Sequence, residues 1–446
     1  MKRFISLLRE LKSRGIEEAW LVGGVVRDFF LGREPTDVDI ACGESDVNAV
    51  VARLGGAIVG KPPFCTVSTS LLGFPVEISL LSGPGIPKDL ERRDFTINAL
   101  AMDAEGNIID PFGGAGDIRR RVLRLVPAPA SPYDADPVRV VRLLRFACTL
   151  GFAVDPETEE RTKSFIAAHK GELANVAQER YGKELLKGFA ERPHYFLSLL
   201  EDYFLLPVVL PQVEAMRGVE QPVIFHPEGD VLRHTFRVLA EAEKTMENTG
   251  QDVVLALGAL LHDVGKPQSA QPHPKYERVC FFGHQEAGEE IALDLLSGWA
   301  VPGKTASQVA ALVKHHMIPG GNFTKRTCVK LIRKLGPELA EKLFDLALCD
   351  ARGSMGSGEN IQAARELFLE VLDNLRQAQE ASDKRWVNGH DVMEILGIPP
   401  GPEVGRVLEE LDVAAGTGRL RGKDEALGWL KERAKGEGKS EVNRTG

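Results

Sequence analysis

The sequence has no apolar run of membrane-spanning length and no closely spaced pair of cysteines. No segment approaches the roughly 20 apolar residues that a transmembrane helix needs, so no membrane partner is expected. The amphipathic segment 1–20 lacks the long apolar core and the cleavage site of a signal peptide. Six scattered cysteines without a CxxC pair argue against a disulfide scaffold or a zinc ribbon and favour a reducing compartment. We therefore expect a cytoplasmic protein.

Positive charge is in the minority overall but is locally concentrated. The 446 residues carry a net charge of −9, which taken alone argues against a nucleic-acid-binding protein. Arginines nevertheless cluster at "LERRDF" (90–95), "DIRRRVLRL" (117–125) and "DPVRVVRLLRF" (136–146). Binding depends on the local electrostatic field rather than on the net charge of the chain. The arginine clusters are therefore candidate binding sites for a polyanionic ligand.

Strand patterns are confined to the first part of the chain, and helical spacing dominates the rest. Short β-branched runs bounded by turn residues lie at 19–24, 37–42, 57–60, 66–72, 75–81 and 107–113. The proline-rich segment 206–230 is typical of a domain junction, and a second boundary is expected between about 355 and 385. We expect an α+β protein with a mixed α/β head (1–125), a helical neck (126–205), a helical body (206–360) and a helical tail (361–446).

Two aspartates with one residue between them stand in "TDVDIA", residues 36–41. Alternate side chains of a strand point to the same face, so Asp37 and Asp39 are expected side by side. Two like charges repel at that distance unless a cation lies between them. Paired carboxylates that hold divalent cations are the core of a two-metal phosphoryl-transfer site, and Glu77 in "PVEISL" is a candidate third carboxylate. The alternative for Glu77 is a solvated strand residue.

A glycine pair precedes these aspartates at the junction of an expected strand and an expected helix. Backbone N–H groups at Gly23 and Gly24 are suited to holding a triphosphate, and Arg27 follows within one turn. A glycine pair alone is more often a simple turn, and an Asp-x-Asp motif alone is more often a strand end. The combination of both motifs about ten residues apart is much more specific.

Several long motifs together carry a family resemblance. "GGVVRDFFLGREPTDVDI", "RRDFTINALAMD", "DPFGG" and "DPVRVVRLLRFA" resemble, in order and spacing, the class II tRNA nucleotidyltransferase and bacterial poly(A) polymerase family. The C-terminal segment "VNGHDVMEILGIPPGPEVGRVLEEL" is similar to the tail of that family. The resemblance covers almost the whole chain.

The resemblance implies a role for each matching residue. It implies that Asp37 and Asp39 bind Mg²⁺ and that Gly24 and Arg27 contact the triphosphate. It implies that Arg93 contacts the nucleotide, while Asp94 and Asn98 brace the sugar and the loop. Arg142 and Arg145 are implied to approach the phosphates and the base pocket. Asp136 and Arg139 resemble the amino-acid template that hydrogen-bonds the Watson–Crick edge of the incoming base.

The template pair is also chemically reasonable. Residues three apart on a helix share a face, so we expect Asp136 and Arg139 to lie together. A carboxylate accepts from an exocyclic amine and a guanidinium donates to a ring acceptor, which suits cytosine and adenine but not guanine or uracil. The alternative is an ordinary salt bridge on a neck helix.

Two departures from the family pattern bear on the product. A glutamate often precedes the template aspartate in the family, whereas this chain has Ala135. The segment between "VEISLL" and "ERRDF" is only "SGPGIPKDL", residues 82–90. Members that add CCA usually carry a longer loop there, and members that add CC resemble this chain in having a short one.

Histidines and aspartates in the helical body suggest a second metal site. "LLHDVGKP" supplies His262 and Asp263. Their order with other histidines and aspartates resembles the HD phosphohydrolase superfamily, which implies a second divalent metal and phosphoester hydrolysis by metal-bound water. Substrates implied for such modules are 2′,3′-cyclic phosphates, 2′-nucleotides or phosphate. The candidate ligands are His234, His262, Asp263, His284, His315 and Asp350, with Asp345 as an alternative to Asp350.

The resemblance therefore implies a Mg²⁺-dependent enzyme that extends tRNA 3′ ends from CTP and ATP. A poly(A) polymerase is the near alternative. An HD-type phosphohydrolase with a regulatory head and a non-catalytic RNA-binding protein are alternatives of other classes. Both are disfavoured, the first by "RRDFTINALA" and the second by the complete set of acidic and basic residues.

Overall fold

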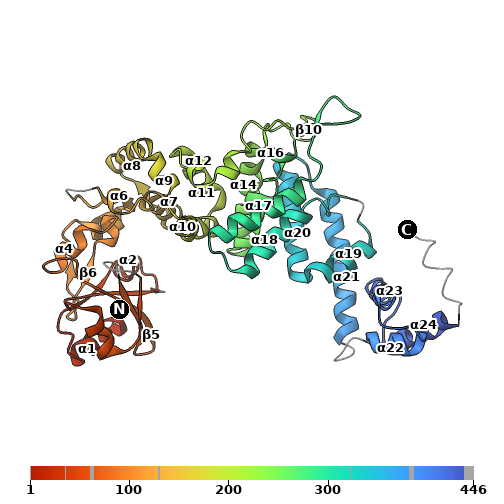
Figure 1. The fold of residues 1–446 in the computed structure, drawn as a ribbon, viewed down its shortest axis with the longest axis horizontal. Helices are drawn as coiled ribbons and strands as arrows, with labels where there is room; N and C mark the ends of the chain where they lie inside the picture. The colour runs from red at the N-terminus through yellow and green to blue at the C-terminus, as the bar shows by residue number, and fades with distance from the viewer. Residues whose placement is uncertain are drawn as a thin grey trace. The chain divides into compact units, whose positions relative to one another are not determined.

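The computed structural model divides the chain into two compact units, Met1–Leu210 and Pro211–Gly446. It describes residues 2–35, 37–60, 65–128, 131–321, 323–380 and 386–435. Each unit is described by itself. The expected α+β class is confirmed, because the head contains a mixed sheet and helices dominate the remaining described residues (Figure 1).

The head is built on a seven-stranded sheet in the order β3-β4-β5-β2-β1-β6-β7. Its strands are β1 (Ala19–Val22), β2 (Val38–Cys42), β3 (Ala57–Val59), β4 (Thr66–Leu71), β5 (Phe74–Leu80), β6 (Ala101–Met102) and β7 (Ile108–Ile109). Only β2 and β5 pair in parallel, and the other neighbours are antiparallel. Six of the seven strands fall in the expected runs, whereas β6 was missed because two residues carry no readable alternation.

Short helices join the strands of the head. They are α1 (Lys2–Ser13), α2 (Gly24–Phe30), α3 (Val47–Leu54), α4 (Ile86–Glu91), the 3₁₀ helix η1 (Thr96–Asn98) and α5 (Gly114–Arg120). In α1, Phe4, Leu7, Leu8 and Leu11 recur at helical spacing and are buried, so this helix packs its apolar face inward. The segment 82–90, expected to be a short loop, contains most of α4.

Helices complete the first unit. They are α6 (Pro132–Ala135), α7 (Arg139–Leu150), α8 (Pro156–Ala168), α9 (Lys170–Ala174), α10 (Gln178–Glu191), α11 (Pro193–Asp202) and α12 (Leu206–Val209), with the strand pair β8 (Val122–Leu123) and β9 (Ala153–Val154). One face of α7 is apolar and buried, and α7 packs against α10 and α11. Its arginines therefore lie on a different face from its core residues.

The second unit begins with the helices of the expected body, followed by one that runs from its end into the expected tail. They are α13 (Pro211–Glu214), α14 (Val231–Thr249), α15 (Val253–Leu261), α16 (Lys266–Ser269), α17 (His284–Gly298), α18 (Gly303–His315), α19 (Lys325–Leu335), α20 (Pro337–Gly353) and α21 (Glu359–Glu380). A small hairpin of β10 (Gln271–Pro272) and β11 (Val279–Cys280) interrupts them. α15 is almost entirely buried, because α14, α18 and α20 pack against it.

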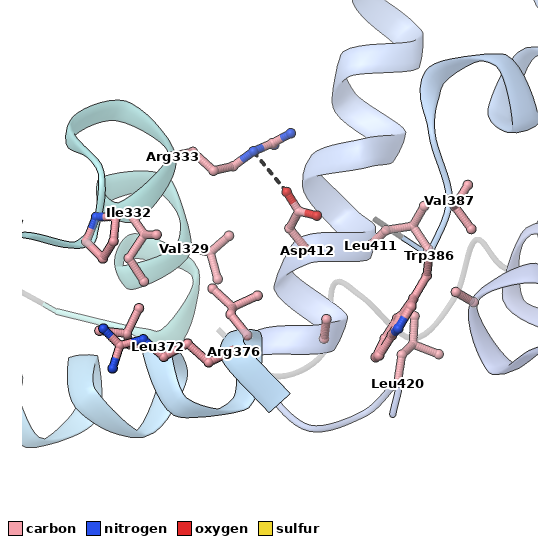
Figure 2. Close-up of a pocket in the computed structure, with 14 residues that line it drawn as sticks. Val329, Ile332, Arg333, Leu372, Arg376, Trp386, Val387, Leu411, Asp412 and Leu420 are labelled. Carbon is pink, nitrogen blue, oxygen red and sulfur yellow. Dashed lines mark ion pairs between the residues drawn. The ribbon is translucent and has the colours of Figure 1, made fainter. Parts of the chain in front are cut away.

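Three helices, α22 (Gly389–Leu396), α23 (Pro402–Gly416) and α24 (Lys423–Ala434), follow at the C-terminal end. Buried Trp386, Val392 and Leu411 belong to one apolar cluster there. Members of this cluster line a cavity of about 470 Å³. Arg333 and Asp412, which also line it, form an ion pair of 3.0 Å (Figure 2). The cavity is lined mainly by aliphatic side chains of α19, α21 and α23.

The division at Leu210 and Pro211 lies within the expected junction 206–230. The other expected boundaries, near 125 and near 360, stay predictions, since each falls inside one compact unit. No helix among the described residues is long and apolar enough to cross a membrane.

Candidate functional site

Three carboxylates meet on one face of the head sheet. Asp37 directly precedes β2, and Asp39 is its second residue. The parallel register of β2 and β5 places Asp39 opposite Glu77, so these two side chains share a face of the sheet. Asp39 is half-buried, whereas Asp37 and Glu77 are exposed. The sheet thus brings together the three acidic residues that the sequence singled out.

The charge state of Asp39 fits a cation-binding site. Burial raises the pKa of Asp39 above its ordinary value; Arg93 opposes that rise, while Glu77 and Asp37 add to it. A carboxylate crowded by two others is most stable when a cation compensates their charge. Carboxylate oxygens are also the ligands that Mg²⁺ prefers in proteins. The residues present therefore fit a divalent cation at this position.

The glycine turn before α2 lies against the same carboxylates. Gly23 has φ of +69°, and a Cβ atom there would lie 2.9 Å from Nη1 of Arg93 and 3.8 Å from Oδ2 of Asp39. The positive φ favours glycine at this position, and a larger side chain would also displace the guanidinium of Arg93. As expected, the pair Gly23-Gly24 joins β1 to α2.

A cavity of about 490 Å³ opens beside these residues and is strongly cationic. Seven basic side chains and four aspartates line it: Arg27, Arg92, Arg93, Arg139, Arg142, Arg145, Lys187, Asp28, Asp37, Asp39 and Asp94. Gly23, Gly24, Asn98 and Phe146 complete the lining. An excess of positive charge in a protein of net charge −9 is suited to a polyanionic ligand. The cavity gathers most of the expected nucleotide-binding residues; Glu77 and Asp136 do not line it.

Arg27 is oriented by a chain of hydrogen bonds. Its Nη1 donates to Oδ1 of Asn98 (2.7 Å), and Nδ2 of Asn98 donates to Oδ1 of Asp94 (2.9 Å). Burial of Asp94 opposes ionisation, but Arg142, Asn98 and Arg139 together hold its pKa below the ordinary value. Asp94 and Asn98 thus fix the direction of an arginine that lines the cavity.

Glu184 on α10 orients two further arginines and was missed from the sequence. It forms ion pairs with Arg145 and, at 3.3 Å, with Arg142. The guanidinium of Arg145 also lies 3.8 Å from the ring centroid of Phe146. Glu184 lies 39 positions from Arg145, so no local spacing could have indicated it.

A second missed carboxylate, Asp89 of α4, holds the arginine pair of "RRDF". Asp89 is fully buried and forms ion pairs with Arg92 (3.0 Å) and Arg93 (3.2 Å). It also accepts from the backbone N–H (3.3 Å) and the hydroxyl (3.1 Å) of Ser82. Burial would raise the pKa of Asp89, but Arg93 and Arg92 outweigh it and lower that pKa. The segment 82–91 is therefore tied to the cavity arginines.

The template pair does not share a helix, which corrects the sequence argument. α7 begins at Arg139, and Asp136 precedes it with an extended backbone. The Asp136 carboxylate accepts from the N–H of Val138 (3.0 Å) and pairs with Arg180 (2.7 Å). Arg139 donates to the carbonyl of Pro132 (3.1 Å). Pro137 and the Asp136 turn set the start of the helix, so the spacing of three does not place both side chains on one helical face.

The second unit gathers its own cluster of histidines and aspartates. Nε2 of His234 (α14) lies 3.2 Å from Nε2 of His262 and 3.0 Å from Oδ1 of Asp350 (α20). Nε2 of His284 (α17) lies 3.3 Å from Nε2 of His316, and both lie within 3.8 Å of Oδ1 of Asp263. These atoms form two groups able to hold a metal ion, one made of His234, His262 and Asp350 and the other of Asp263, His284 and His316.

The orientation of the rings fits a divalent metal. Nδ1 of His262, His284 and His316 lies 2.7–2.9 Å from the carbonyl of the residue three positions earlier. A proton on Nδ1 leaves the Nε2 lone pair directed into the cluster, as in metal-binding histidines. Although burial opposes it, Asp350 and Glu228 raise the pKa of His234 to about 9, so positive charge is favoured there.

His316, rather than the expected His315, joins this cluster. The side chain of His315, at the end of α18, is not in either metal-binding group. His316 is the first residue after α18, and its Nε2 is the one directed at His284. Asp345 pairs with Arg365 (3.0 Å) and lies outside the cluster, in contrast to Asp350.

Two residues extend the cluster beyond the expected ligands. Oε1 of Glu228 lies 2.8 Å from Nδ1 of His234 and 2.9 Å from Nδ1 of His226. Nζ of Lys266 lies 2.6 Å from Oδ2 of Asp263. Gly265 allows this turn to approach α17, because a Cβ atom there would lie 2.2 Å from the carbonyl oxygen of His284. The spacing of three residues between Asp263 and Lys266 in "HDVGK" could have indicated their contact, whereas no local pattern indicated that of Glu228.

Family models match most of the chain. The poly(A) polymerase head domain matches residues 19–57 and 77–124, and the model described as a probable RNA and SrmB binding site of polymerase A matches 151–217. The HD domain model matches residues 231–375. The three matches follow the expected order of head, neck and body.

Relatives match over nearly their full length. An A-adding tRNA nucleotidyltransferase of Deinococcus radiodurans is 33% identical over 92% of this chain and 94% of its own. A CC-adding tRNA nucleotidyltransferase of Thermus thermophilus is 33% identical over 93% of each chain. The crystal structure of a Bacillus stearothermophilus CCA-adding enzyme in complex with CTP is 25% identical, covers 97% of each chain and has a TM-score of 0.62. With the carboxylate-edged cationic cavity, these matches show that the chain is an enzyme of the tRNA nucleotidyltransferase family, with an HD domain.

Proposed function

We propose that the head transfers nucleotides to the 3′ end of tRNA, with CTP as its main substrate. The observation that carries this proposal is the cavity in which six arginines and a lysine adjoin Asp37 and Asp39. A nucleoside triphosphate supplies the negative charge that this cavity is built to receive, and the carboxylates lie at its edge. When bound, Mg²⁺ would activate the attacking 3′-hydroxyl and stabilise the pyrophosphate leaving group.

The side chains of the cavity divide this task. Arg27, held by Asn98, and Arg93, held by Asp89, bind the phosphates. Arg142 and Arg145, held by Glu184, approach from α7. Holding each guanidinium through a second contact reduces the conformational entropy that is lost when the nucleotide binds. Arg139 donates to the base edge, and Asp136 accepts from its amine after leaving Arg180.

The compact segment 82–91 supports a CC-adding enzyme. A longer loop is usual where cytidine addition is followed by adenosine addition, and here the segment is a short helix whose Asp89 binds Arg92 and Arg93. Because the ion pair with Asp89 fixes Arg93 in one position, we expect the cavity to accept one kind of nucleobase. Relatives of both kinds, A-adding and CC-adding, are equally identical to this chain, so the product needs a direct measurement.

Product length on defined acceptors tests this function. The purified protein is incubated with tRNA that lacks its whole 3′-terminal CCA and with tRNA that ends in CC, in each case with CTP, ATP or both. The proposal predicts two cytidines on the first acceptor and none or little adenosine on the second. Adenosine on the second acceptor alone would establish an A-adding enzyme, and a long adenosine tract would establish a poly(A) polymerase and overturn the tRNA assignment.

The HD cluster supports a second activity, metal-dependent phosphoester hydrolysis. Asp263 contacts ligands of both groups, because its Oδ2 lies 3.2 Å from Nε2 of His262 and its Oδ1 lies 3.6 Å from Nε2 of His284. Lys266 supplies a positive charge beside it. When a divalent metal is bound there, it would lower the pKa of its bound water and so provide a nucleophile. Hydrolysis of 2′,3′-cyclic nucleotides by the wild type, lost on Asp263→Asn and retained in Asp37→Ala, is the expected result. The absence of hydrolysis with every divalent metal would refute this activity.

A further inference from the structure

The cavity of the HD cluster extends well beyond the metal-binding residues. It has a volume of about 610 Å³, within the usual range for small-molecule sites. His226, Asp263, His284, His316 and Asp350 line it on one side. Phe225, His273, Arg278 and Phe282 line it as well, and none of them is a candidate ligand. The question is what these aromatic side chains contact.

Aromatic rings at or next to this cavity are exposed. Phe225 and Phe282, which line it, are 55% and 61% exposed, and Tyr276, which does not line it but contacts His273, is 60% exposed. Large apolar side chains that remain exposed together around a polar site indicate a ligand-binding surface. We name the group of Phe225, His273, Tyr276 and Phe282 the aromatic rim.

Contacts between the rim residues and Arg278 hold them in place. The ring centroid of His273 lies 4.7 Å from that of Tyr276 and 5.9 Å from that of Phe282. The guanidinium of Arg278 lies 5.0 Å from the ring of Phe225 and 5.0 Å from that of Tyr276. The N–H of His273 donates to the carbonyl of Arg278 (2.8 Å), which closes the loop of the β10–β11 hairpin. The rim is therefore an ordered platform with a cation within it.

The chain connects the rim directly to the metal-binding cluster. Phe282 precedes His284 by two residues, and the carbonyl of Phe281 lies 2.7 Å from Nδ1 of His284. Nζ of Lys266 lies 5.4 Å from the ring of Phe281 and 2.6 Å from Asp263. A ligand with a phosphate at Asp263 and Lys266 therefore has its remaining atoms within reach of the hairpin.

We propose that the aromatic rim is a nucleobase subsite, which holds the base of a nucleotide whose phosphate lies at the metal-binding cluster. This inference rests on the proposed phosphohydrolase function and assigns the residues that bind the base of its substrate. Aromatic rings and guanidinium planes stack on nucleobases without much preference for sequence. The chemistry is shared by a mononucleotide and by the terminal nucleotide of an RNA whose phosphate is at its 3′ end.

Kinetics with paired substrates test the subsite. One substrate is a 2′,3′-cyclic nucleotide, another is a short RNA with a 2′,3′-cyclic end, and the third is glycerol 1,2-cyclic phosphate, which has no base. Phe282→Ala is expected to raise KM for the nucleotide or the RNA about tenfold, with kcat and glycerol cyclic phosphate hydrolysis unchanged. Phe282→Trp is expected to restore KM, and Phe282→Leu is not.

The matched control is Phe204→Ala in the first unit, where a phenylalanine is 67% exposed and lines none of the cavities described above. It is expected to leave all three substrates unaffected. A rise in KM for the mononucleotide assigns the subsite to free nucleotides, and a rise for the RNA alone assigns it to RNA ends. Unchanged KM for both with Phe282→Ala overturns the proposal, and so does an equal loss with the base-free substrate.

A binding measurement separates this proposal from the hydrolytic activity. Calorimetry with a nucleoside 2′-monophosphate, in saturating CTP to occupy the head cavity, reports on the rim whether or not the cluster hydrolyses anything. Weaker binding to Phe282→Ala than to the wild type and to Phe204→Ala supports the subsite even if hydrolysis is absent. No binding, or equal binding to all three proteins, overturns it while leaving hydrolysis of other phosphoesters open to its own test.

Discussion

At the scale of single residues, buried carboxylates determine where the basic side chains of the head point. Asp89, Asp94 and Glu184 each contact at least one arginine of the cavity, and none of them needs to touch the nucleotide for this purpose. A buried ion pair of this kind contributes less to stability than to fixing one arrangement of side chains. Their removal is expected to affect both folding and nucleotide affinity.

Asp89→Asn is expected to lower stability in a pH-dependent manner. The folded pKa of Asp89 lies below its ordinary value of 3.8, so its contribution is complete above about pH 4 and is lost as the pH falls through the folded pKa. The variant should be less stable by about 2 kcal/mol at pH 7, and the difference should shrink toward pH 3. Urea unfolding at several pH values measures this. A difference that does not change with pH would contradict the charge-based account.

His316→Ala is expected to lower transition-metal binding to the second unit, whereas His315→Ala is not. Only His316 has Nε2 in the cluster, since His315 lies outside both metal-binding groups. The number of Mn²⁺ or Ni²⁺ ions bound per chain after dialysis is the measurement. If His315→Ala loses metal and His316→Ala retains it, the assignment is wrong.

Motifs with local spacing were predicted, and contacts made by the tertiary fold were not. Asp39 and the glycine turn were readable because strand alternation and a turn signal act over a few residues. The choice between His315 and His316 depends on how α18 is rotated in its packing, which the sequence does not reveal. Asp89 had a local signal, since Arg92 and Arg93 follow it at helical spacing, but Glu184 is brought to Arg145 only by the packing of α7 on α10.

At the scale of elements, α10 is the support for the arginines of α7. Gly188 of α10 lies against Phe196 of α11, and a Cβ atom at Gly188 would lie 2.4–2.6 Å from that ring. The strands of the head were foreseen from alternation, whereas the start of α7 was not, because Pro137 and the turn in which Asp136 accepts from the N–H of Val138 decide it. The residue at which α7 begins and the packing of α10 on α7 therefore could not be predicted from the sequence.

Gly188→Ala is expected to destabilise the first unit by about 1–3 kcal/mol, because the added methyl group overpacks the contact with Phe196. CTP binding should weaken as well, since Glu184 lies on the same helix one turn earlier. The matched control is Gly171→Ala in α9, where a Cβ atom meets nothing within 4 Å and stability should be equal or slightly higher. Chemical unfolding and CTP titration of both variants provide the test. Equal stability of the two variants would refute the packing argument.

At the scale of the whole molecule, the chain consists of two compact units with separate chemistry. The nucleotide cavity lies entirely within Met1–Leu210, and the metal cluster lies entirely within Pro211–Gly446. The basic residues of the first cavity explain how a chain of net charge −9 can hold a triphosphate. Each ligand is thus expected to stabilise its own unit.

Calorimetric unfolding of the full chain should show this division. CTP at about one hundred times its dissociation constant should stabilise the first unit by about 2.7 kcal/mol, and so raise the temperature of one transition while leaving the other unchanged. Mn²⁺ or Ni²⁺ at low concentration should act mainly on the other transition. A single transition that moves with either ligand would contradict independent units.

The most direct measurement of the central claim is cytidine incorporation into tRNA by Asp37→Ala beside the wild type, with 2′,3′-cyclic nucleotide hydrolysis assayed in the same preparations. Incorporation by the variant is expected to fall about a hundredfold to a thousandfold, as when a group that stabilises charge at the reacting centre is removed. Hydrolysis and the unfolding temperature should stay unchanged. Incorporation at the wild-type rate would show that the carboxylates beside the cationic cavity do not carry the chemistry.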